Sequence, residues 1–255
     1  MAGLKDAPKL YRFLHRVLPP IVNPWFPVNI EGLDNIPAQR PAIVAANHLS
    51  FIDSIFMPVN IPRPVYFLAK AEYFDSWRTR WFFAGAGCVP TRRDNPDAAM
   101  AALLTGVDIL NSGELLGIYP EGTRSPDGRL YRGKTGPLRM ALTAEVPIIP
   151  VGIIGTDKVM PTGSRFPKRV PVTVRYGEPL EFAQYRGHAE DRAALRAGTD
   201  ELMYEIMQLS GQEYVDEYAR KPGRPAARAP ADSPPGEQAP SSDGDPTATD
   251  VRRAG

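Results

Sequence analysis

The chain has 255 residues, of which 43% are hydrophobic and 23% charged, and its formal net charge is +1 at pH 7. This length and apolar fraction predict a globular core in one large or two small domains, and the near-zero charge argues against nucleic-acid binding driven by bulk electrostatics. The single cysteine, Cys88, excludes an internal disulfide framework and a cysteine-rich metal site.

The N-terminal segment 1–26 contains the pattern of an amphipathic helix. Its apolar positions recur at helical spacing, at Leu10, Phe13, Leu14, Val17 and Leu18. Basic residues flank this stripe, and Pro19-Pro20 is expected to end the helix. A basic amphipathic helix is typical of an interfacial membrane anchor, but the same stripe could pack on the domain's own core. No apolar run reaches the roughly 18 residues needed to span a bilayer, so the chain is not expected to cross a membrane.

The region 27–220 alternates short β-rich runs with helical patterns. The predicted strands are 28–30, 42–46, 65–69, 115–119, 148–154 and 172–176. Predicted helices cover 96–111, 135–145 and 189–209. The alternation predicts an α/β fold, a single domain with a largely parallel mixed sheet flanked by helices. In such sheets the functional site lies at the carboxyl ends of the strands.

The first of these helices has the clearest boundaries. It follows Asp94-Asn95, carries Pro96 at its first position and stops at Asn111-Ser112-Gly113. Its apolar side is expected to be formed by Met100, Leu103, Leu104 and Val107.

A histidine and an aspartate follow the predicted strand 42–46, in the run Asn47-His48-Leu49-Ser50-Phe51-Ile52-Asp53. Neutral histidine accepts a proton at physiological pH, and a carboxylate on its other ring nitrogen fixes the tautomer. The pair requires His48 in the turn and Asp53 one helical turn further on, reaching back. The alternative is a capping histidine and a helix-terminal aspartate without chemistry. Ser50 lacks a Gly-x-Ser-x-Gly elbow, which disfavours it as a nucleophile.

A second polar run, Glu121-Gly122-Thr123-Arg124, follows the predicted strand 115–119. Glycine allows close backbone approach, threonine offers a hydroxyl, and the guanidinium fork suits phosphate. Lys70 ends another predicted strand, and Arg92-Arg93 adds further cations. These positions predict an anion site, although the two arginines could instead pair with Asp94 or Asp97 on the surface.

Four blocks in this order resemble the glycerolipid acyltransferase family, specifically the lysophosphatidate acyltransferases. The blocks are Asn47-His48-x4-Asp53, Gly87-x2-Pro90-x2-Arg93, Tyr119-Pro120-Glu121-Gly122-Thr123-Arg124-Ser125 and Val146-Pro147-Ile148-x-Pro150-Val151. The similarity covers about residues 28–179. The usual phenylalanine before Pro-Glu-Gly is Tyr119 here, a mild departure from the family pattern.

The resemblance implies a role for each matching residue. His48 is the base that deprotonates the acceptor hydroxyl, and Asp53 orients it. The glycerol phosphate is positioned by Arg93, Glu121, Gly122, Thr123 and Arg124, and Pro147 shapes the acyl-donor side. We add Lys70 and Lys134 as candidate substrate-binding cations.

The implied reaction transfers a fatty acyl group from acyl-CoA or acyl-carrier protein to the sn-2 hydroxyl of 1-acylglycerol-3-phosphate. The product is phosphatidic acid, and neither a metal nor a cofactor is expected. The acceptor could instead be another lysophospholipid or a glycolipid. A catalytically silent lipid carrier is a further hypothesis, which the intact His48/Asp53 pair disfavours.

A two-chain lipid product favours the membrane interpretation of the N-terminal helix. We expect peripheral attachment at the cytoplasmic face of the cell membrane. The segment 221–255 is rich in Pro, Ala, Ser and Gly and almost without large apolar side chains. This composition predicts a disordered tail.

One motif favours a different class of protein. The run from Gly128 to Thr135 matches the phosphate-loop pattern Gly-x4-Gly-Lys-Thr. That pattern requires a strand directly before its first glycine, and here a polar turn separates Gly128 from the predicted strand. A phosphate-loop nucleotide-binding protein is therefore a remote alternative, and Lys134 could instead contribute to the acceptor pocket.

Overall fold

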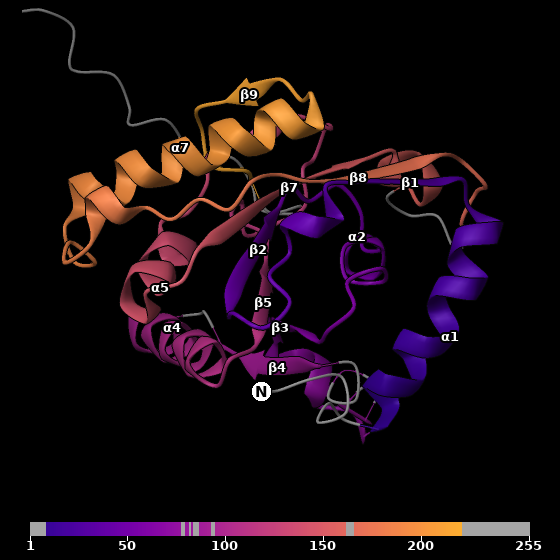
Figure 1. Ribbon diagram of the computed structural model, residues 1–255, viewed down its shortest axis with the longest axis horizontal. Helices are drawn as coiled ribbons and strands as arrows, with labels where there is room; N and C mark the ends of the chain where they lie inside the picture. The colour runs from indigo at the N-terminus through magenta and orange to yellow at the C-terminus, as the bar shows by residue number, and fades with distance from the viewer. Residues whose placement is uncertain are drawn as a thin grey trace, which may run out of the picture. The chain divides into compact units, whose positions relative to one another are not determined.

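The computed structural model describes residues 9–77, 80–81, 83, 87–92, 95–161 and 166–220. The predicted tail 221–255 and Arg93 lie outside these ranges, as does the side chain of Lys70. The described residues form an α/β fold around a seven-stranded sheet (Figure 1).

The large sheet has the strand order β1-β8-β7-β2-β5-β3-β4. Its strands are β1 Val28–Glu31, β2 Ala42–Ala46, β3 Val65–Lys70, β4 Cys88–Thr91, β5 Leu115–Ile118, β7 Ile148–Ile154 and β8 Val172–Tyr176. All neighbours pair in parallel except β7 and β8. The expected mixed, largely parallel sheet is confirmed. The prediction missed β4 and extended β5 by one residue, to Tyr119.

The helices are α1 Lys9–Trp25, α2 Asp53–Phe56, α4 Pro96–Asn111, α5 Gly136–Ala144, α6 Thr156–Val159 and α7 Arg192–Ser210. Short 3-10 helices cover Leu33–Asn35, Ala71–Phe74 and Ala183–Tyr185, and a two-stranded sheet pairs β6 Leu130–Tyr131 with β9 Tyr214–Val215. The start of α4 is as predicted, because the Asn95 side chain accepts a hydrogen bond from the Ala98 amide at 2.7 Å.

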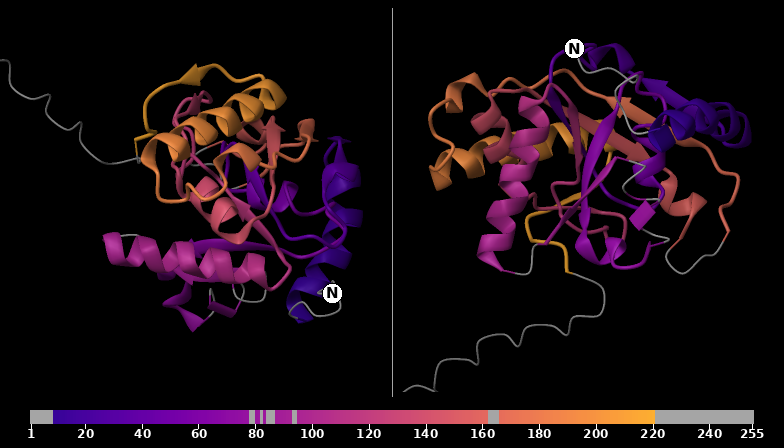
Figure 2. Two further views of the ribbon diagram at one scale, coloured as in Figure 1. Left: turned by 60° about the vertical axis from the view of Figure 1, so that its left-hand side comes forward. Right: turned by 90° about the horizontal axis from the view of Figure 1, so that it is seen from below.

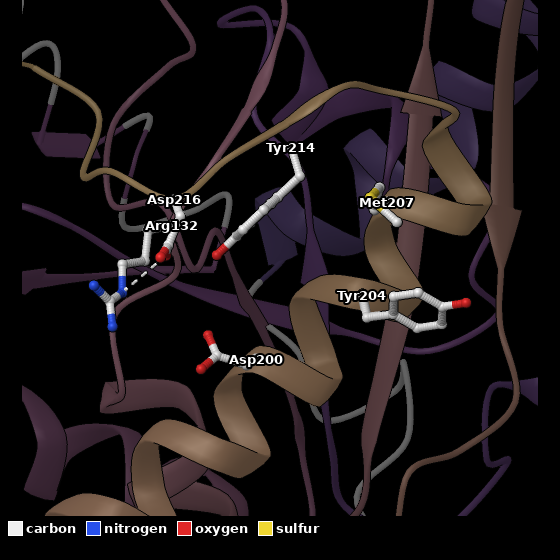
Figure 3. Close-up of a pocket in the computed structure, with 6 residues that line it drawn as sticks. All are labelled: Arg132, Asp200, Tyr204, Met207, Tyr214 and Asp216. Atoms are coloured by element: carbon white, nitrogen blue, oxygen red, sulfur yellow. Dashed lines mark ion pairs between the residues drawn. The ribbon is translucent and has the colours of Figure 1, made fainter.

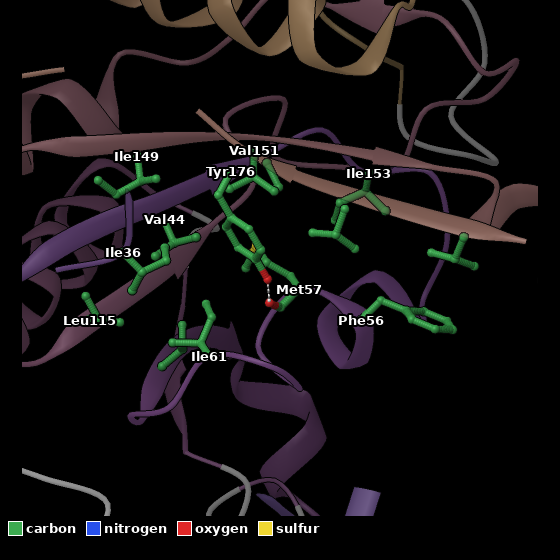
Figure 4. Close-up of a cluster of buried hydrophobic side chains, with 14 of the residues drawn as sticks. Ile36, Val44, Phe56, Met57, Ile61, Leu115, Ile149, Val151, Ile153 and Tyr176 are labelled. Atoms are coloured by element: carbon green, nitrogen blue, oxygen red, sulfur yellow. Dashed lines mark hydrogen bonds between the residues drawn. The ribbon is translucent and has the colours of Figure 1, made fainter. Parts of the chain in front are cut away.

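Both faces of the sheet are covered, and successive residues of the central strand β2 face opposite cores although all are buried. On β2, Val44 faces one core and Ile43 the other. The first core packs beneath α1 and α2, and there the Tyr176 hydroxyl donates to the Met57 carbonyl (Figure 4). The second core packs beneath α4, α5 and α7, which lie on the side away from α1 (Figures 1 and 2).

The predicted apolar side of α4 is partly wrong. Met100 and Leu104 are 45% and 57% exposed, whereas Ala102 and Leu110 are buried. The reason is close helix packing: a Cβ placed on Gly106 would lie 2.3 Å from the Met140 sulfur of α5. Small residues therefore occupy the interface, and the larger ones beside them face outward.

The prediction that Pro19-Pro20 ends the first helix is also wrong, because α1 continues to Trp25 with three prolines inside it. Proline costs helical hydrogen bonds, but here tertiary packing offsets that loss. Val22 is buried, and Phe26 lies edge-on to Phe56 with ring centroids 5.5 Å apart.

In the predicted stripe of α1, Phe13 is 60% exposed, whereas Leu10, Leu14, Val17 and Leu18 are half-buried. Outside the stripe, Tyr11 and Val22 are buried against the domain and Trp25 is exposed. The helix therefore packs on the core with one side and presents apolar side chains to the outside with another. Within the described ranges, no helix combines the length and hydropathy needed to cross a bilayer.

Candidate active site

The two polar runs meet at the carboxyl ends of adjacent parallel strands. β2 pairs with β5, so the chain leaves both strands at the same edge of the sheet. The His48 amide donates to Glu121 Oε2 at 3.0 Å, and the Ser125 amide donates to the His48 carbonyl at 2.7 Å. These bonds hold the His48 turn directly against the segment 121–125, here called the anion loop.

His48 and Asp53 form a hydrogen-bonded pair. His48 Nδ1 lies 2.8 Å from Asp53 Oδ2, and the Asp53 side chain is buried. The same oxygen accepts the amides of Leu49 and Ser50 at 2.7 and 2.8 Å. Asp53 is the first residue of α2 rather than one turn inside it. The segment from His48 to Asp53 therefore forms a compact turn.

This pairing assigns the imidazole tautomer. A carboxylate can only accept, so the proton lies on Nδ1 and the lone pair on Nε2. None of the described residues forms a hydrogen bond with Nε2, and the His48 side chain is 16% exposed. The ring is thus held in place with a proton-accepting atom available.

Tyr119 supports the imidazole from one face. The two rings are stacked, with centroids 3.9 Å apart and planes inclined by 11°. The Tyr119 hydroxyl lies 3.0 Å from Ser54 Oγ, on the helix that begins with Asp53. Burial raises the Tyr119 pKa well above its usual value, so the hydroxyl stays protonated. The sequence marked Tyr119 only as a departure from a family pattern.

The tip of the anion loop is open. Gly122 has φ +73°, a conformation that favours glycine. Thr123 is half-buried, and Arg124 is exposed without an ion pair or hydrogen bond to any described residue. The Lys134 amide donates to the Pro120 carbonyl, and a Cβ on Gly122 would lie 2.9 Å from Lys134 Nζ. The Lys134 ammonium is therefore close to this loop.

Glu121 has a different environment from its neighbours. It is 1% exposed, and its two oxygens accept the amides of His48 and Tyr131 at 3.0 and 2.9 Å. Burial raises the Glu121 pKa to about 7, although the two amide hydrogen bonds partly oppose that rise. The buried Glu121 carboxylate thus joins the His48 turn to β6 through both of its oxygens.

The remaining predicted site residues are Lys70, Arg93 and Pro147. Lys70 ends β3 opposite Thr91 of β4, at the same edge of the sheet as His48. Arg93 lies outside the described residues. Pro147 is buried at the amino end of β7, where its carbonyl accepts the Ile43 amide at 3.0 Å. The length of β2 separates Pro147 from His48, so the structure does not bring Pro147 to the site.

The phosphate-loop alternative does not match the backbone. β5 ends at Ile118, and a turn rather than a strand precedes Gly128. Within the pattern, β6 is hydrogen-bonded to β9 instead of forming an open loop around an anion.

Two side-chain amides near the site, those of Asn47 and Gln212, were not predicted to have a role. The buried Asn47 side chain accepts the Ile153 amide and donates to the Ile153 carbonyl, and it also donates to Gln212 Oε1 at 2.7 Å. Gln212 lies 165 residues further along the chain, and no local pattern distinguishes it. Among the described residues, no group of three or more His, Cys, Asp or Glu side chains could hold a metal ion.

Comparisons with known proteins agree with this geometry. The chain is 30% identical to the 1-acyl-sn-glycerophosphate (LPA) acyltransferase PlsC of Thermotoga maritima, whose crystal structure matches with a TM-score of 0.58 over 71% of each chain. It is 28% identical to the 1-acyl-sn-glycerol-3-phosphate acyltransferase of Bacillus subtilis, over 80% of this chain and 98% of that one.

A chloroplastic 1-acyl-sn-glycerol-3-phosphate acyltransferase of Arabidopsis thaliana, LPAT1, is 34% identical over 61% of this chain. The match spans less than half the length of that relative, 44%. The model of the family described as Acyltransferase matches residues 27–154, half of the chain. The chain therefore belongs to the acyltransferase family.

Proposed function

We propose that this chain transfers a fatty acyl group from an acyl thioester to the sn-2 hydroxyl of 1-acylglycerol-3-phosphate, which yields phosphatidic acid. The observation that carries the proposal is the direct hydrogen bonding between the His48 turn and the anion loop. It holds the turn that carries the His48 base against the loop that carries Arg124, as a reaction at a hydroxyl near a phosphate requires. The names of the relatives from three organisms support the same acceptor.

In this mechanism His48 Nε2 removes the proton of the acceptor hydroxyl while the oxygen attacks the thioester carbonyl carbon. The carbon–sulfur bond then breaks, and the thiolate takes the proton back from His48. Asp53 stabilises the transient imidazolium through Nδ1. General-base assistance of this kind contributes about 10²–10⁴ in rate.

The acceptor phosphate would be held by the anion loop. Arg124 offers a bidentate donor fork, Thr123 a hydroxyl and Gly122 close backbone approach. Lys134 lies beside Gly122 and adds a positive charge. Lys70 and Arg93 are proposed as further cations of the pocket, whereas Glu121 serves to position the loop.

The donor would be acyl-CoA or acyl-carrier protein. No other cofactor enters the proposed mechanism, because the thioester is already an activated acyl group and the chain's own base removes the only proton that must leave. Other lysophospholipids or glycolipids are the alternative acceptors. An assay of one labelled acyl-CoA against a panel of lysolipids, with and without the phosphomonoester, distinguishes them.

Peripheral attachment to the cytoplasmic face of the membrane is part of the proposal. The exposed side of α1 presents Phe13, Ile21 and Trp25, with Arg12 and Arg16 nearby. Exchanging Phe13 and Trp25 for serine should weaken binding to anionic vesicles in a sedimentation assay. Tyr204→Ser, an equally exposed aromatic on α7, is the matched control. Equal binding of both variants would argue against α1 as the attachment site.

His48→Ala tests the proposed function. We expect turnover of lysophosphatidate and acyl-CoA to fall about 10²–10⁴-fold, with an unchanged thermal unfolding midpoint. His188→Ala, an exposed histidine outside the site, is the control. Normal turnover by His48→Ala would exclude His48 as the base.

A further inference from the structure

We propose that the segment 211–218, here called the strap, is a working part of the active site that positions the anion loop. The strap lies beyond the residues matched by the family model. The kinetic part of this claim depends on the proposed function, whereas the structural part does not.

The strap returns to the site from the end of α7. The helix ends at Gly211, which has φ +70° and donates to the Met207 carbonyl. The chain then runs parallel to β6. The Leu130 amide donates to the Glu213 carbonyl at 2.9 Å, and the Arg132 amide donates to the carbonyls of Val215 and Glu217. The strap thus satisfies backbone amides of the segment that follows the anion loop.

Gln212 connects the strap to the catalytic turn. Its Oε1 accepts from Asn47 Nδ2 at 2.7 Å, and its Nε2 donates to the Gly128 carbonyl at 2.6 Å. Asn47 immediately precedes His48, and Gly128 follows the anion loop by three residues. One side chain therefore joins the two sides of the site.

The contacts form a closed circuit. From Gln212 it passes through Asn47 to His48, whose amide bonds Glu121. Glu121 accepts the Tyr131 amide, and Tyr131 lies in β6, which pairs with β9 of the strap. In such a circuit, loss of one hydrogen bond makes the two segments that it joined more mobile. The remaining hydrogen bonds of the circuit are then weakened as well.

Tyr214 of the strap packs against the core cluster that includes Met203 and Ile206 of α7. A hollow between the strap and α7 is lined by Tyr214 and Asp216 of the strap, by Arg132, and by Asp200, Tyr204 and Met207 of α7 (Figure 3). Arg132 Nε forms an ion pair with Asp216 at 3.4 Å, in which the Asp216 side chain is exposed. The backbone pairing with β6 and the two Gln212 hydrogen bonds are the contacts through which the strap reaches the segment 128–132 and Asn47.

The hydrogen-bonded pair of His48 and Asp53 should be less sensitive to the strap than the anion loop is. Asp53 is held by the amides of Leu49 and Ser50 within its own turn. The anion loop, in contrast, depends on the segment 128–132. Loosening the strap should therefore raise the KM for lysophosphatidate more than it lowers kcat, which a merely structural role would not do.

Gln212→Met removes both hydrogen bonds, and Gln212→Glu keeps an oxygen for Asn47 but removes the donor to Gly128. Each should raise the acceptor KM about three- to tenfold, which is the effect of losing a neutral hydrogen bond. The kcat of each variant should stay within about twofold of the wild-type kcat. Gln208→Met, an exposed glutamine on α7, is the control. An unchanged KM in both variants, or a fall in kcat alone, overturns the kinetic part.

Amide hydrogen exchange tests the structural part without turnover. The Ser125 amide, bonded to the His48 carbonyl, should exchange several-fold faster in both Gln212 variants and not in Gln208→Met. Unchanged Ser125 exchange overturns the inference. A wild-type chain that fails to acylate lysophosphatidate refutes the proposed function, while the exchange result still decides the role of the strap.

Discussion

The His48 turn and the anion loop lie side by side, but their side chains differ in burial and in hydrogen bonding. Asp53 is buried, and a single oxygen accepts three hydrogen bonds, while the imidazole is stacked on Tyr119. Arg124 is exposed and pairs with none of the described residues. One region is held by the protein, and the other is left available to a ligand.

The difference follows from what each group must do. A general base needs one tautomer and one orientation, and a preorganised environment lowers the cost of charging it. A binding cation is more useful unpaired, because an internal carboxylate would compete with the phosphate. Changes on the His48 side should therefore affect kcat, and changes at the loop tip should affect KM.

The largest effect is expected for Asp53→Asn. The asparagine amide would donate to Nδ1 and move the imidazole proton to Nε2, which removes the proton-accepting atom. We expect kcat to fall about 10²–10⁴-fold with a nearly unchanged KM. Asp108→Asn, on the exposed side of α4, is the control for steady-state kinetics. A rise in KM at constant kcat would contradict the assignment.

Arg124→Ala tests the other region. Loss of a charge-assisted hydrogen bond should raise the KM for lysophosphatidate about 10- to 100-fold and leave kcat nearly unchanged. As a control, Arg40→Ala removes another exposed arginine, which pairs with Glu181. Arg40 precedes β2 and so lies at the opposite end of that strand from His48. If both variants show the wild-type KM, the phosphate binds elsewhere.

A smaller effect is expected at Tyr119, which supports the base. Tyr119→Leu removes the stacked ring and the stabilisation of an imidazolium by its face, so kcat should fall about 3- to 30-fold. Tyr119→Phe keeps the ring, loses only the hydroxyl contact with Ser54, and should retain most activity. Equal kcat values for the two variants would show that stacking does not contribute.

Glu121 connects the two regions, and its expected effect on turnover is the smallest. Its pKa is raised from 4.5 to about 7 in the folded protein. Between these pH values the unfolded chain releases the proton and the folded chain keeps it, so this group lowers stability as pH rises through that window. Above about pH 7 the contribution of Glu121 to the free energy of unfolding no longer changes with pH. The total loss of stability from this group is at most about 3 kcal/mol.

Glu121→Gln does not titrate at this position, so urea unfolding at pH 5 and pH 7.5 should show a smaller loss of stability than in the wild type. Glu178→Gln, at an exposed carboxylate, should behave like the wild type. Identical pH dependence of Glu121→Gln and the wild type would show that Glu121 titrates normally.

Much of this architecture could be predicted from local patterns. The ranges 42–46, 148–154 and 172–176 match their strands at both ends, because the first two are continuous apolar runs of buried strands and the third alternates apolar and polar residues. Parallel pairing then implies that His48 and the anion loop emerge at one edge. The hydrogen bonds between them agree with that expectation.

The errors arose where close packing outweighs local preference. Pro19-Pro20 does not end α1, because Val22 and Phe26 pack on the core beyond it. Met100 and Leu104 face outward, because Gly106 allows α4 to approach α5 closely.

The sequence by itself determined most of the strands and helices, the spacing of His48 and Asp53, and the presence of a glycine-containing loop with an arginine. These are properties of neighbouring residues, which composition and periodicity record. Only the tertiary structure decided that Tyr119 stacks on His48, that Glu121 accepts the amides of His48 and Tyr131, and that Gln212 closes the circuit. Each depends on contacts between distant segments, which have no period and leave no local pattern.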